Sequence, residues 1–192
     1  RIMPAIHSGN RTMLLDVAQI DDAVDILHGH IVTYLGRISR KSLTEDQTRE
    51  LVNLMSAVNE LENIGDIIET DLVTLGIKRI EEGVSISDAT RAMLDNLNIM
   101  IASAADQAMI AVTENNPDSA ERVIAMKSEI NQLMDSAAMH EAQRLVAEEP
   151  NRLGAYTIEM DIIEKLKRIY YFSKRMAKAV SVIPDGNAEE VA

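Results

Sequence analysis

Apolar residues recur along the chain at alternating steps of three and four positions, with polar residues between them. This is the period of an amphipathic helix, which buries one face and exposes the other. The pattern predicts five long helices, over about residues 12–40, 45–82, 88–114, 117–149 and 152–181. No strand candidate is found. Because short connections between long helices make them antiparallel neighbours, we expect an all-α bundle.

The first two helices carry the clearest apolar stripes. The stripe of the first helix consists of Val17, Ile20, Val24, Leu27, Ile31, Leu35 and Ile38. The stripe of the second helix consists of Leu51, Leu54, Val58, Leu61, Gly65, Ile68, Leu72 and Leu75. Stripes of this kind are the buried seams of helix pairs, so we expect the two to meet at one interface.

Local signals place the helix boundaries. Thr44 is a candidate N-cap with Gln47 three residues later, which is the pattern of a capping box. Gly83 breaks the periodicity, and Ser87 follows it as a candidate cap for the next helix. Pro117 is well placed to open the fourth helix, because proline is favoured in the first helical turn.

The sequence contains a weak internal repeat. When it is shifted by about 105 positions, Val24 and Leu27 fall on Ile130 and Leu133, and turns coincide as well as stripes. The repeat divides the chain into two three-helix units, residues 1–86 and 87–181, followed by a tail at 182–192 that we expect to be disordered. The first unit has only the stub "RIMPAIH" of its first helix, so we expect about 20 further residues of that helix upstream.

The composition narrows the functional classes. The formal net charge of −12 argues against a chain that binds nucleic acid or an anionic membrane over its whole surface, and suits cation binding. No stretch approaches the roughly 20 apolar residues of a membrane span, so we expect these residues to be soluble. The absence of cysteine excludes disulfide and thiolate chemistry.

Acidic residues line both apolar stripes of the N-terminal half. The first helix carries Asp21, Asp25 and His28, and the second carries Glu62, Asp66 and Glu69 at the same spacing. Like charges one turn apart repel, and burial adds to the cost. A bound cation would reverse the sign of that interaction, and Gly65 would let the two helices approach each other. The alternative is a solvated acidic face, which is common on helices.

Oxygen-rich clusters with an occasional imidazole suit hard or borderline metals. We therefore expect a divalent or trivalent metal ion, Fe, Mn, Mg, Zn or Ca, at the first unit.

These residues resemble a known family. Two tandem three-helix units, an acid-xxx-Asp motif formed by Asp21 and Asp25, and the sequence "LENIGD" on the third helix are similar to the PhoU domain. The resemblance implies a PhoU-like bundle with multinuclear metal sites formed by the acidic motifs. The second unit departs from this pattern, because Lys127, Asn131, Lys167 and Tyr171 stand at the corresponding positions. We therefore expect no metal cluster there.

The resemblance also implies a function. PhoU-like domains occur as free-standing regulators of phosphate uptake and signalling, and fused behind the membrane part of bacterial sodium/phosphate cotransporters. The altered second unit and the short first helix favour the fused form. The chain would then be a regulatory domain at the cytoplasmic face of the inner membrane, with the membrane transport domain of the same polypeptide as its partner. A homo-oligomer is a further expectation.

Two alternatives stay open, a free-standing adaptor and a metal-dependent helical-bundle enzyme. The enzyme is disfavoured, because such sites need carboxylate and histidine ligands from four helices, and the second unit supplies lysines. No phosphate-binding glycine loop or nucleophile motif is found, so we expect no catalysis.

The last helix is basic in an acidic chain. One stripe of it consists of Lys167, Tyr171, Lys174 and Lys178. This stripe is a candidate binding surface for a partner, including anionic headgroups. The alternative is that the basic residues of this helix neutralise acids within the bundle. The few aromatic residues argue against a nucleic-acid platform, so no nucleic-acid partner is expected.

Overall fold

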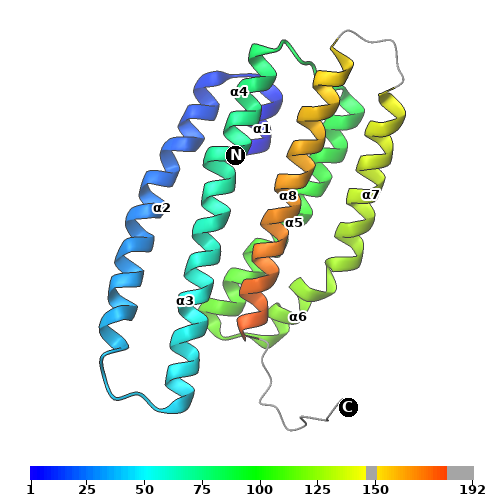
Figure 1. Ribbon diagram of the computed structural model, residues 1–192. Coiled ribbons are helices and arrows are strands. Elements are labelled where there is room, and N and C mark those ends of the chain that lie inside the picture. Colours follow the sequence, from blue (N-terminus) through cyan, green and yellow to red (C-terminus); the bar gives the residue numbers. More distant parts are fainter. Residues whose placement is uncertain (146–150, 181–192) are drawn as a thin grey trace, which may run out of the picture.

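The computed structural model describes residues 1–145 and 151–180 (Figure 1). The described residues form helices and their connections, without a strand, which confirms the all-α prediction. The elements in chain order are α1 (Ile2–Ser8), α2 (Arg11–Ile38), α3 (Glu45–Asp66), the π-helical segment η1 (Ile67–Leu72), α4 (Val73–Glu81), α5 (Asp88–Glu114), α6 (Pro117–Ala125), α7 (Lys127–Arg144) and α8 (Arg152–Val180). The predicted tail at 182–192 lies outside the described residues.

The predicted caps are present. The side chain of Thr44 accepts from the backbone N–H of Gln47, and the side chain of Gln47 accepts from the backbone N–H of Thr44, which completes the capping box. The side chain of Ser87 caps α5, and Pro117 occupies the first turn of α6. Gly83 has a φ of 63°, a left-handed conformation that glycine adopts without strain. Local chemistry therefore fixed these helix ends.

Two interruptions were not predicted. The second long helix continues from α3 to α4 through η1, a π-helical segment that begins directly after Asp66. A π-turn holds an extra residue, so it rotates the residues that follow it relative to those before it. The fourth predicted helix is broken at Met126, where ψ is −12° instead of the usual α-helical value. The chain bends at this point between α6 and α7 (Figure 1).

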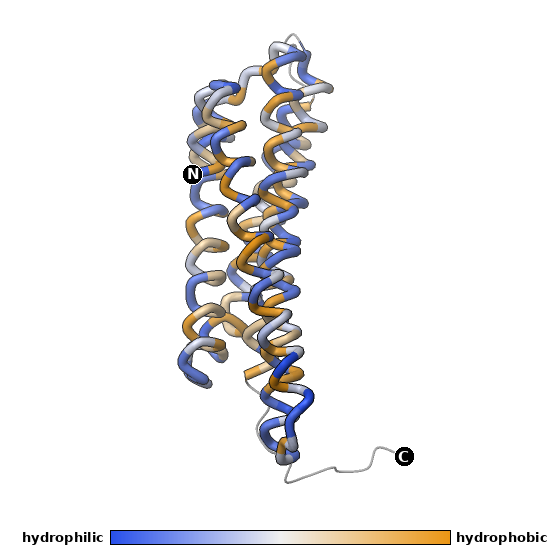
Figure 2. The backbone as a smooth tube through the Cα atoms, turned by 90° about the vertical axis from the view of Figure 1, so that its left-hand side faces the viewer, coloured by the Kyte–Doolittle hydropathy of each residue, from blue (hydrophilic) through white to orange (hydrophobic). Residues whose placement is uncertain are grey.

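Helix α8 lies at the centre of the bundle. It packs against α5, α3 and α6, while α2 packs on the other side of α3 and also contacts α4 and η1. Figure 1 shows α2 and α7 at opposite edges of the molecule, and Figure 2, turned by 90°, shows the helices following one long axis. The buried apolar side chains form one cluster that crosses residues 86 and 87, so the proposed boundary between two units does not interrupt the core.

The predicted stripes are only partly buried. On α3 the most buried line runs through Ala57, Glu60 and Ile64, one position before the predicted line, because α8 covers that side of the helix. On α2, Ile20 and Leu27 are exposed, although both belong to the predicted seam. A helix at the edge of a bundle has neighbours on one flank only, and periodicity alone cannot show which flank is covered.

Candidate functional site

The acidic stripes lie on neighbouring helices, as predicted. Asp21 on α2 faces Gly65 on α3 so closely that a Cβ added to Gly65 would lie 2.7 Å from Oδ1 of Asp21. The same Cβ would lie 3.6 Å from Cγ1 of Val24. Any side chain at position 65 would therefore compete with the carboxylate for space. The glycine allows the close approach of α2 and α3 that the sequence suggested.

Negative charge is concentrated around Asp21. Burial raises the pKa of Asp21, and the nearby carboxylates of Asp25, Glu69, Asp66 and Glu62 raise it further. Each of these four acids was predicted to belong to the site, and each lies near enough to act on Asp21. The fold therefore places the other four predicted carboxylates close enough to act electrostatically on Asp21.

His28 takes a different neighbour. Its Nε2 lies 3.3 Å from Oδ1 of Asn59 on α3, in an exposed contact. The oxygen-rich residue types around Asp21 fit a hard cation. Within residues 1–145 and 151–180, however, no three His, Asp or Glu side chains are already arranged as a set that could hold a metal ion. Metal binding at Asp21, Asp25, His28, Glu62, Asp66 and Glu69 stays a prediction.

The corresponding face of the second unit is positively charged. Lys127 at the start of α7 aligns with Asp21, and it lies near Lys174 of α8. Burial lowers the pKa of Lys174, and the positive charges of Lys127 and Lys178 lower it further. The two units thus carry opposite charges at related positions. The positive face of the second unit does not suit a metal ion.

The basic helix α8 has a paired side and an exposed side. Arg175 forms an ion pair of 2.8 Å with Glu60 of α3, and Lys165 forms one of 3.2 Å with Asp71 of η1. These pairs fit the alternative in which α8 neutralises acids within the bundle. Lys167 and Tyr171 of the predicted partner stripe are exposed instead. The role of this stripe in partner binding stays a prediction.

The structure contains a buried ionic cluster that was not predicted from the sequence. Arg152 donates to Oε2 of Glu141 at 2.6 Å and to Oε2 of Glu159 at 3.0 Å, and all three side chains are buried. Thr90 of α5 donates to Oε1 of Glu141 at 2.9 Å, and Arg144 donates to Oγ1 of Thr90 at 2.6 Å. The cluster therefore ties α5, α7 and α8 together at one end of the bundle.

The two buried glutamates have opposite pKa shifts. Burial raises the pKa of Glu159 to about 8, and a hydrogen bond with Glu141 adds to the rise. Burial also acts to raise the pKa of Glu141, but hydrogen bonds with Glu159, Arg152 and Thr90 outweigh it, so this pKa is lowered. Of the two carboxyl groups, Glu159 is therefore the one that favours the protonated form, and Glu141 the one that favours the ionised form.

A signal for this cluster was present in the sequence. The apolar residues Ile162, Leu166 and Ile169 of the last helix follow each other at steps of four and three. Extended towards the N-terminus by the same steps of three and four, this line passes through Glu159, Ala155 and Arg152. Charged residues on a buried stripe must be paired with each other.

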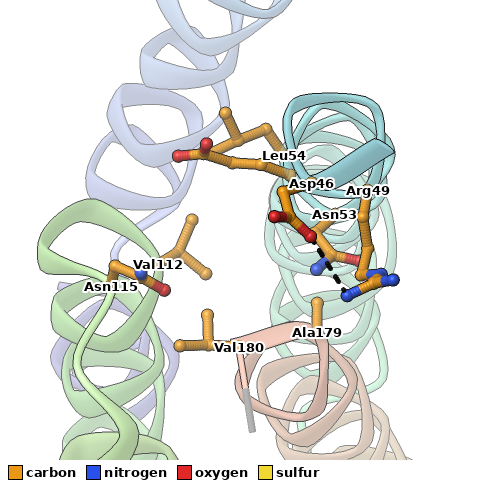
Figure 3. Close-up of a pocket in the computed structure, with 9 residues that line it drawn as sticks. Asp46, Arg49, Asn53, Leu54, Val112, Asn115, Ala179 and Val180 are labelled. Carbon is orange, nitrogen blue, oxygen red and sulfur yellow. Dashed lines mark ion pairs between the residues drawn. The ribbon is translucent and has the colours of Figure 1, made fainter. Parts of the chain in front are cut away.

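The structure also contains a pocket that no prediction anticipated. It has a volume of about 260 Å³ and lies where the start of α3 meets the ends of α5 and α8 (Figure 3). Its lining is chemically mixed, and Asp46 and Arg49 form an ion pair of 3.6 Å at its edge. The remaining lining residues are Glu50, Asn53, Leu54, Val112, Asn115, Ala179 and Val180.

Comparison with known proteins supports the resemblance. Residues 1–70, which contain both acidic stripes, match the family model described as the PhoU domain. No curated protein matches the chain. The crystal structure of PhoU from Pseudomonas aeruginosa has a TM-score of 0.84 to this structure at 19% sequence identity, over 93% of this chain and 84% of that chain. The fold is therefore a PhoU-like helical bundle. Among the described helices, none is both long enough and apolar enough to cross a membrane.

Proposed function

We propose that this chain is a PhoU-type regulator of phosphate uptake that acts through protein contacts and not through catalysis. The observation that carries the proposal is the PhoU domain match of residues 1–70, which span both acidic stripes. The likeness of the whole fold to a PhoU protein supports it. Regulation by contact also fits a bundle whose charged groups are divided between an acidic face on α2 and α3 and a basic stripe on α8.

The test is phosphate uptake in the host cell. We expect that removing the segment that encodes these residues, with the rest of the gene left in frame, changes how uptake of radiolabelled phosphate responds to external phosphate. Reintroducing the segment should restore the response. Uptake that is identical with and without the segment, at both low and high phosphate, would contradict the proposal.

The transporter context has two versions. In the version we propose, the partner is the membrane transport domain of a sodium/phosphate cotransporter, which would place these residues at the cytoplasmic face of the inner membrane. A free-standing PhoU-type adaptor fits the fold at least as well, because the similar PhoU protein is matched over 84% of its length. The two differ in one measurement. Collapse of the sodium gradient abolishes the regulated uptake in the first version and leaves it in the second.

The acidic cluster is proposed to hold a hard metal ion. Asp21, Asp25 and Glu62, with Asp66 and Glu69, supply the carboxylate oxygens, and His28 is the adjacent imidazole. A bound cation would supply positive charge that offsets the mutual repulsion of these groups. Carboxylates of α2 and η1 that share one cation would keep these two elements at a fixed separation. Metal occupancy would then bias how this face meets a partner.

Calorimetric titration with Mn²⁺, Mg²⁺, Ca²⁺, Zn²⁺ and Fe²⁺ tests the metal site directly. We expect saturable binding of at least one ion, weakened at least tenfold in the variant Asp21→Asn/Glu62→Gln. Asp22→Asn is the matched control, because Asp22 is the exposed neighbour of Asp21 on the same helix. Equal binding by the double variant and the control would show that the ions interact only with the overall negative charge.

The stripe Lys167, Tyr171, Lys174 and Lys178 is proposed as the surface that meets an acidic partner. The support is the mutual proximity of Lys127, Lys174 and Lys178, which leaves positive charge concentrated on this side. The variant Lys167→Glu/Lys174→Glu should lose the uptake response without loss of folding. A response equal to that of the wild type would remove this stripe from the proposal.

A further inference from the structure

Helices α7 and α8 carry hydrogen-bond donors at the five positions that are acidic in the first unit. The internal repeat relates α2 to α7 by a shift of 106 positions, and α3 with η1 to α8 by a shift of 105. The five donors are Lys127, Asn131, Lys167, Tyr171 and Lys174, which correspond to Asp21, Asp25, Glu62, Asp66 and Glu69. Three of the five are cationic and none is acidic. The chemistry of the acidic stripes is therefore reversed in the second unit.

Packing brings the start of α7 close to α8. Helices α6 and α7 both contact α8, and the buried hydroxyl of Tyr170 donates to the backbone carbonyl of Val123 on α6 at 3.0 Å. Lys127 begins α7 four residues after Val123. Lys174 follows Tyr170 by the same interval, and its Nζ lies 5.7 Å from the centre of the Tyr170 ring. Because helical side chains lean towards the N-terminus of their helix, Lys174 reaches back towards Lys127.

The positive charges at this place lack acidic neighbours. The charge of Lys127 acts on Lys174, which is half-buried, and together with burial and the charge of Lys178 it lowers the pKa of Lys174. Among residues 1–145 and 151–180, no acid forms an ion pair with Lys127, Lys167 or Lys174. Like charges that are partly withdrawn from water are stabilised by a bound ion of opposite charge.

Other cations of α8 show a different arrangement. Arg175 pairs with Glu60 of α3 at 2.8 Å, and Lys165 pairs with Asp71 of η1 at 3.2 Å. The acids of the bundle therefore neutralise cations on the side of α8 towards α3 and η1. The side towards α7, where Lys174 lies near Lys127, offers its charges to a ligand from outside the bundle.

The ligand that fits these groups is a small oxyanion with more than one negative charge. Ammonium groups bind phosphate as point charges, so several of them can approach it from different directions. Tyr171 and Asn131 are exposed, and their hydroxyl and amide groups can donate to further oxygens. Three cations favour a dianion over a monoanion, because the attraction grows with the product of the charges. The net charge of −12 repels anions from the chain as a whole, so binding depends on this local cluster.

We propose that Lys127, Lys167 and Lys174, with Tyr171 and Asn131 on the same two helices, form a binding site for a dissolved oxyanion of the phosphate type. The bound anion would occupy the charges with which this stripe of α8 meets an acidic partner, so phosphate and partner would compete. The inference deepens the proposed function and rests on it for this competition alone. The site itself is tested without phosphate uptake.

Calorimetric titration with inorganic phosphate, at low ionic strength and slightly alkaline pH, tests the site. We expect saturable binding that weakens as salt is added, and similar binding of sulfate, which is also a tetrahedral dianion. Nitrate should bind at least tenfold more weakly than phosphate, because it carries a single charge.

Two double variants test whether these particular lysines hold the anion. Lys127→Gln/Lys174→Gln should bind phosphate at least tenfold more weakly than the wild type. Lys41→Gln/Lys78→Gln is the matched control, because it removes the same charge from the turn before α3 and from α4. The control should keep the wild-type affinity within about twofold. Circular dichroism without phosphate establishes that both variants remain folded.

The lysines can also report the bound anion directly. Reductive methylation with a ¹³C label keeps the charge of lysine and makes each side chain visible in an NMR titration. Saturating phosphate should raise the pKa of Lys174, because an adjacent anion favours the charged ammonium form. The signal of Lys41 should titrate in the same way with and without phosphate.

Two results would overturn the inference. The first is equal phosphate affinity in the two double variants. The second is the absence of saturable binding of phosphate and sulfate, and phosphatidylglycerol vesicles that then bind the wild type but not Lys127→Gln/Lys174→Gln would assign the lysines to lipid headgroups instead. Phosphate binding that is lost in this variant, while uptake in the host cell still responds to phosphate as in the wild type, would confirm the site and reject only its regulatory role.

Discussion

The carboxylate of Asp21 leaves no room for a side chain at Gly65, since a Cβ on Gly65 would lie only 2.7 Å from Oδ1 of Asp21. Glycine weakens a helix interior by about 1 kcal/mol relative to alanine. At position 65 this weakening accompanies a close contact between α2 and α3 at Asp21, whose pKa four neighbouring acids raise. A substitution at Gly65 should therefore affect both the packing of α2 on α3 and the carboxylate of Asp21.

Gly65→Ala should separate these two roles. The methyl group would displace the carboxylate of Asp21, while alanine would favour the helix, so we expect a free energy of unfolding within about 1 kcal/mol of the wild type. Cation affinity should fall at least tenfold in calorimetric titration. Gly29→Ala is the control, because a Cβ there meets no atom within 4 Å. That variant should gain about 0.5–1 kcal/mol and keep its cation binding. Unchanged affinity in Gly65→Ala would argue against a cation site at Asp21.

Gly76→Ala should destabilise the protein in spite of the better helix former. A Cβ on Gly76 would lie 2.7 Å and 2.9 Å from the two Cδ atoms of Leu14, and 3.2 Å from Cγ1 of Ile6. All three residues are buried, so the contact can be relieved only by moving the core. We expect a loss of about 1–3 kcal/mol in urea unfolding. A variant as stable as the wild type would mean that α1 and α2 shift freely at this end.

Arg152→Met should be among the most destabilising substitutions in the chain. It would leave the ionised Glu141 buried without the cation that pairs with it, a change that costs about 3–5 kcal/mol in comparable buried pairs. Adding Glu141→Gln should recover part of the loss. Arg168→Met is the control, because its 3.5 Å pair with Asp71 is partly exposed and should contribute less than about 1 kcal/mol. Similar losses of unfolding free energy in both single variants would show that the buried ion pairs stabilise the protein no more than an exposed pair does.

The pH dependence of stability should report on Glu159. Its pKa in the folded protein is about 8, against an ordinary value of 4.5, so between these values the folded state holds a proton that the unfolded state has released. The free energy of unfolding must then fall as pH rises from about 5 to 8, with a slope of up to about 1.4 kcal/mol per pH unit from this group. Glu141 acts in the opposite sense, because its lowered pKa makes stability fall as pH drops below 4.5.

Glu159→Gln isolates this contribution. Glutamine cannot ionise, so the decline between pH 5 and 8 should be smaller than in the wild type when urea unfolding is measured across that range. Glu164→Gln changes an exposed carboxyl on the same helix and should keep the wild-type slope. If Glu159→Gln and the wild type decline in parallel, Glu159 is already ionised at neutral pH.

Local sequence determined several of the helix ends. The capping box at Thr44, the cap at Ser87 and the left-handed Gly83 act within a few residues, so their chemistry is readable without the fold. The same holds for the acidic stripes, because the spacing of Asp21 and Asp25 places them on one helix face whatever surrounds it. That α2 and α3 lie side by side also followed from the short connection between them.

Tertiary structure alone decided which faces are buried. Periodicity marks Ile20 and Ile162 equally as seam residues, yet one is exposed and the other is buried, because α8 is surrounded and α2 lies at an edge. The contact of Thr90 with Glu141 joins residues 51 positions apart, a pairing that no local rule specifies. The periodicity of a helix indicates which residues can be buried, but only the packed fold determines which of them have a neighbour. The same packing creates the buried surroundings that raise the pKa of Glu159.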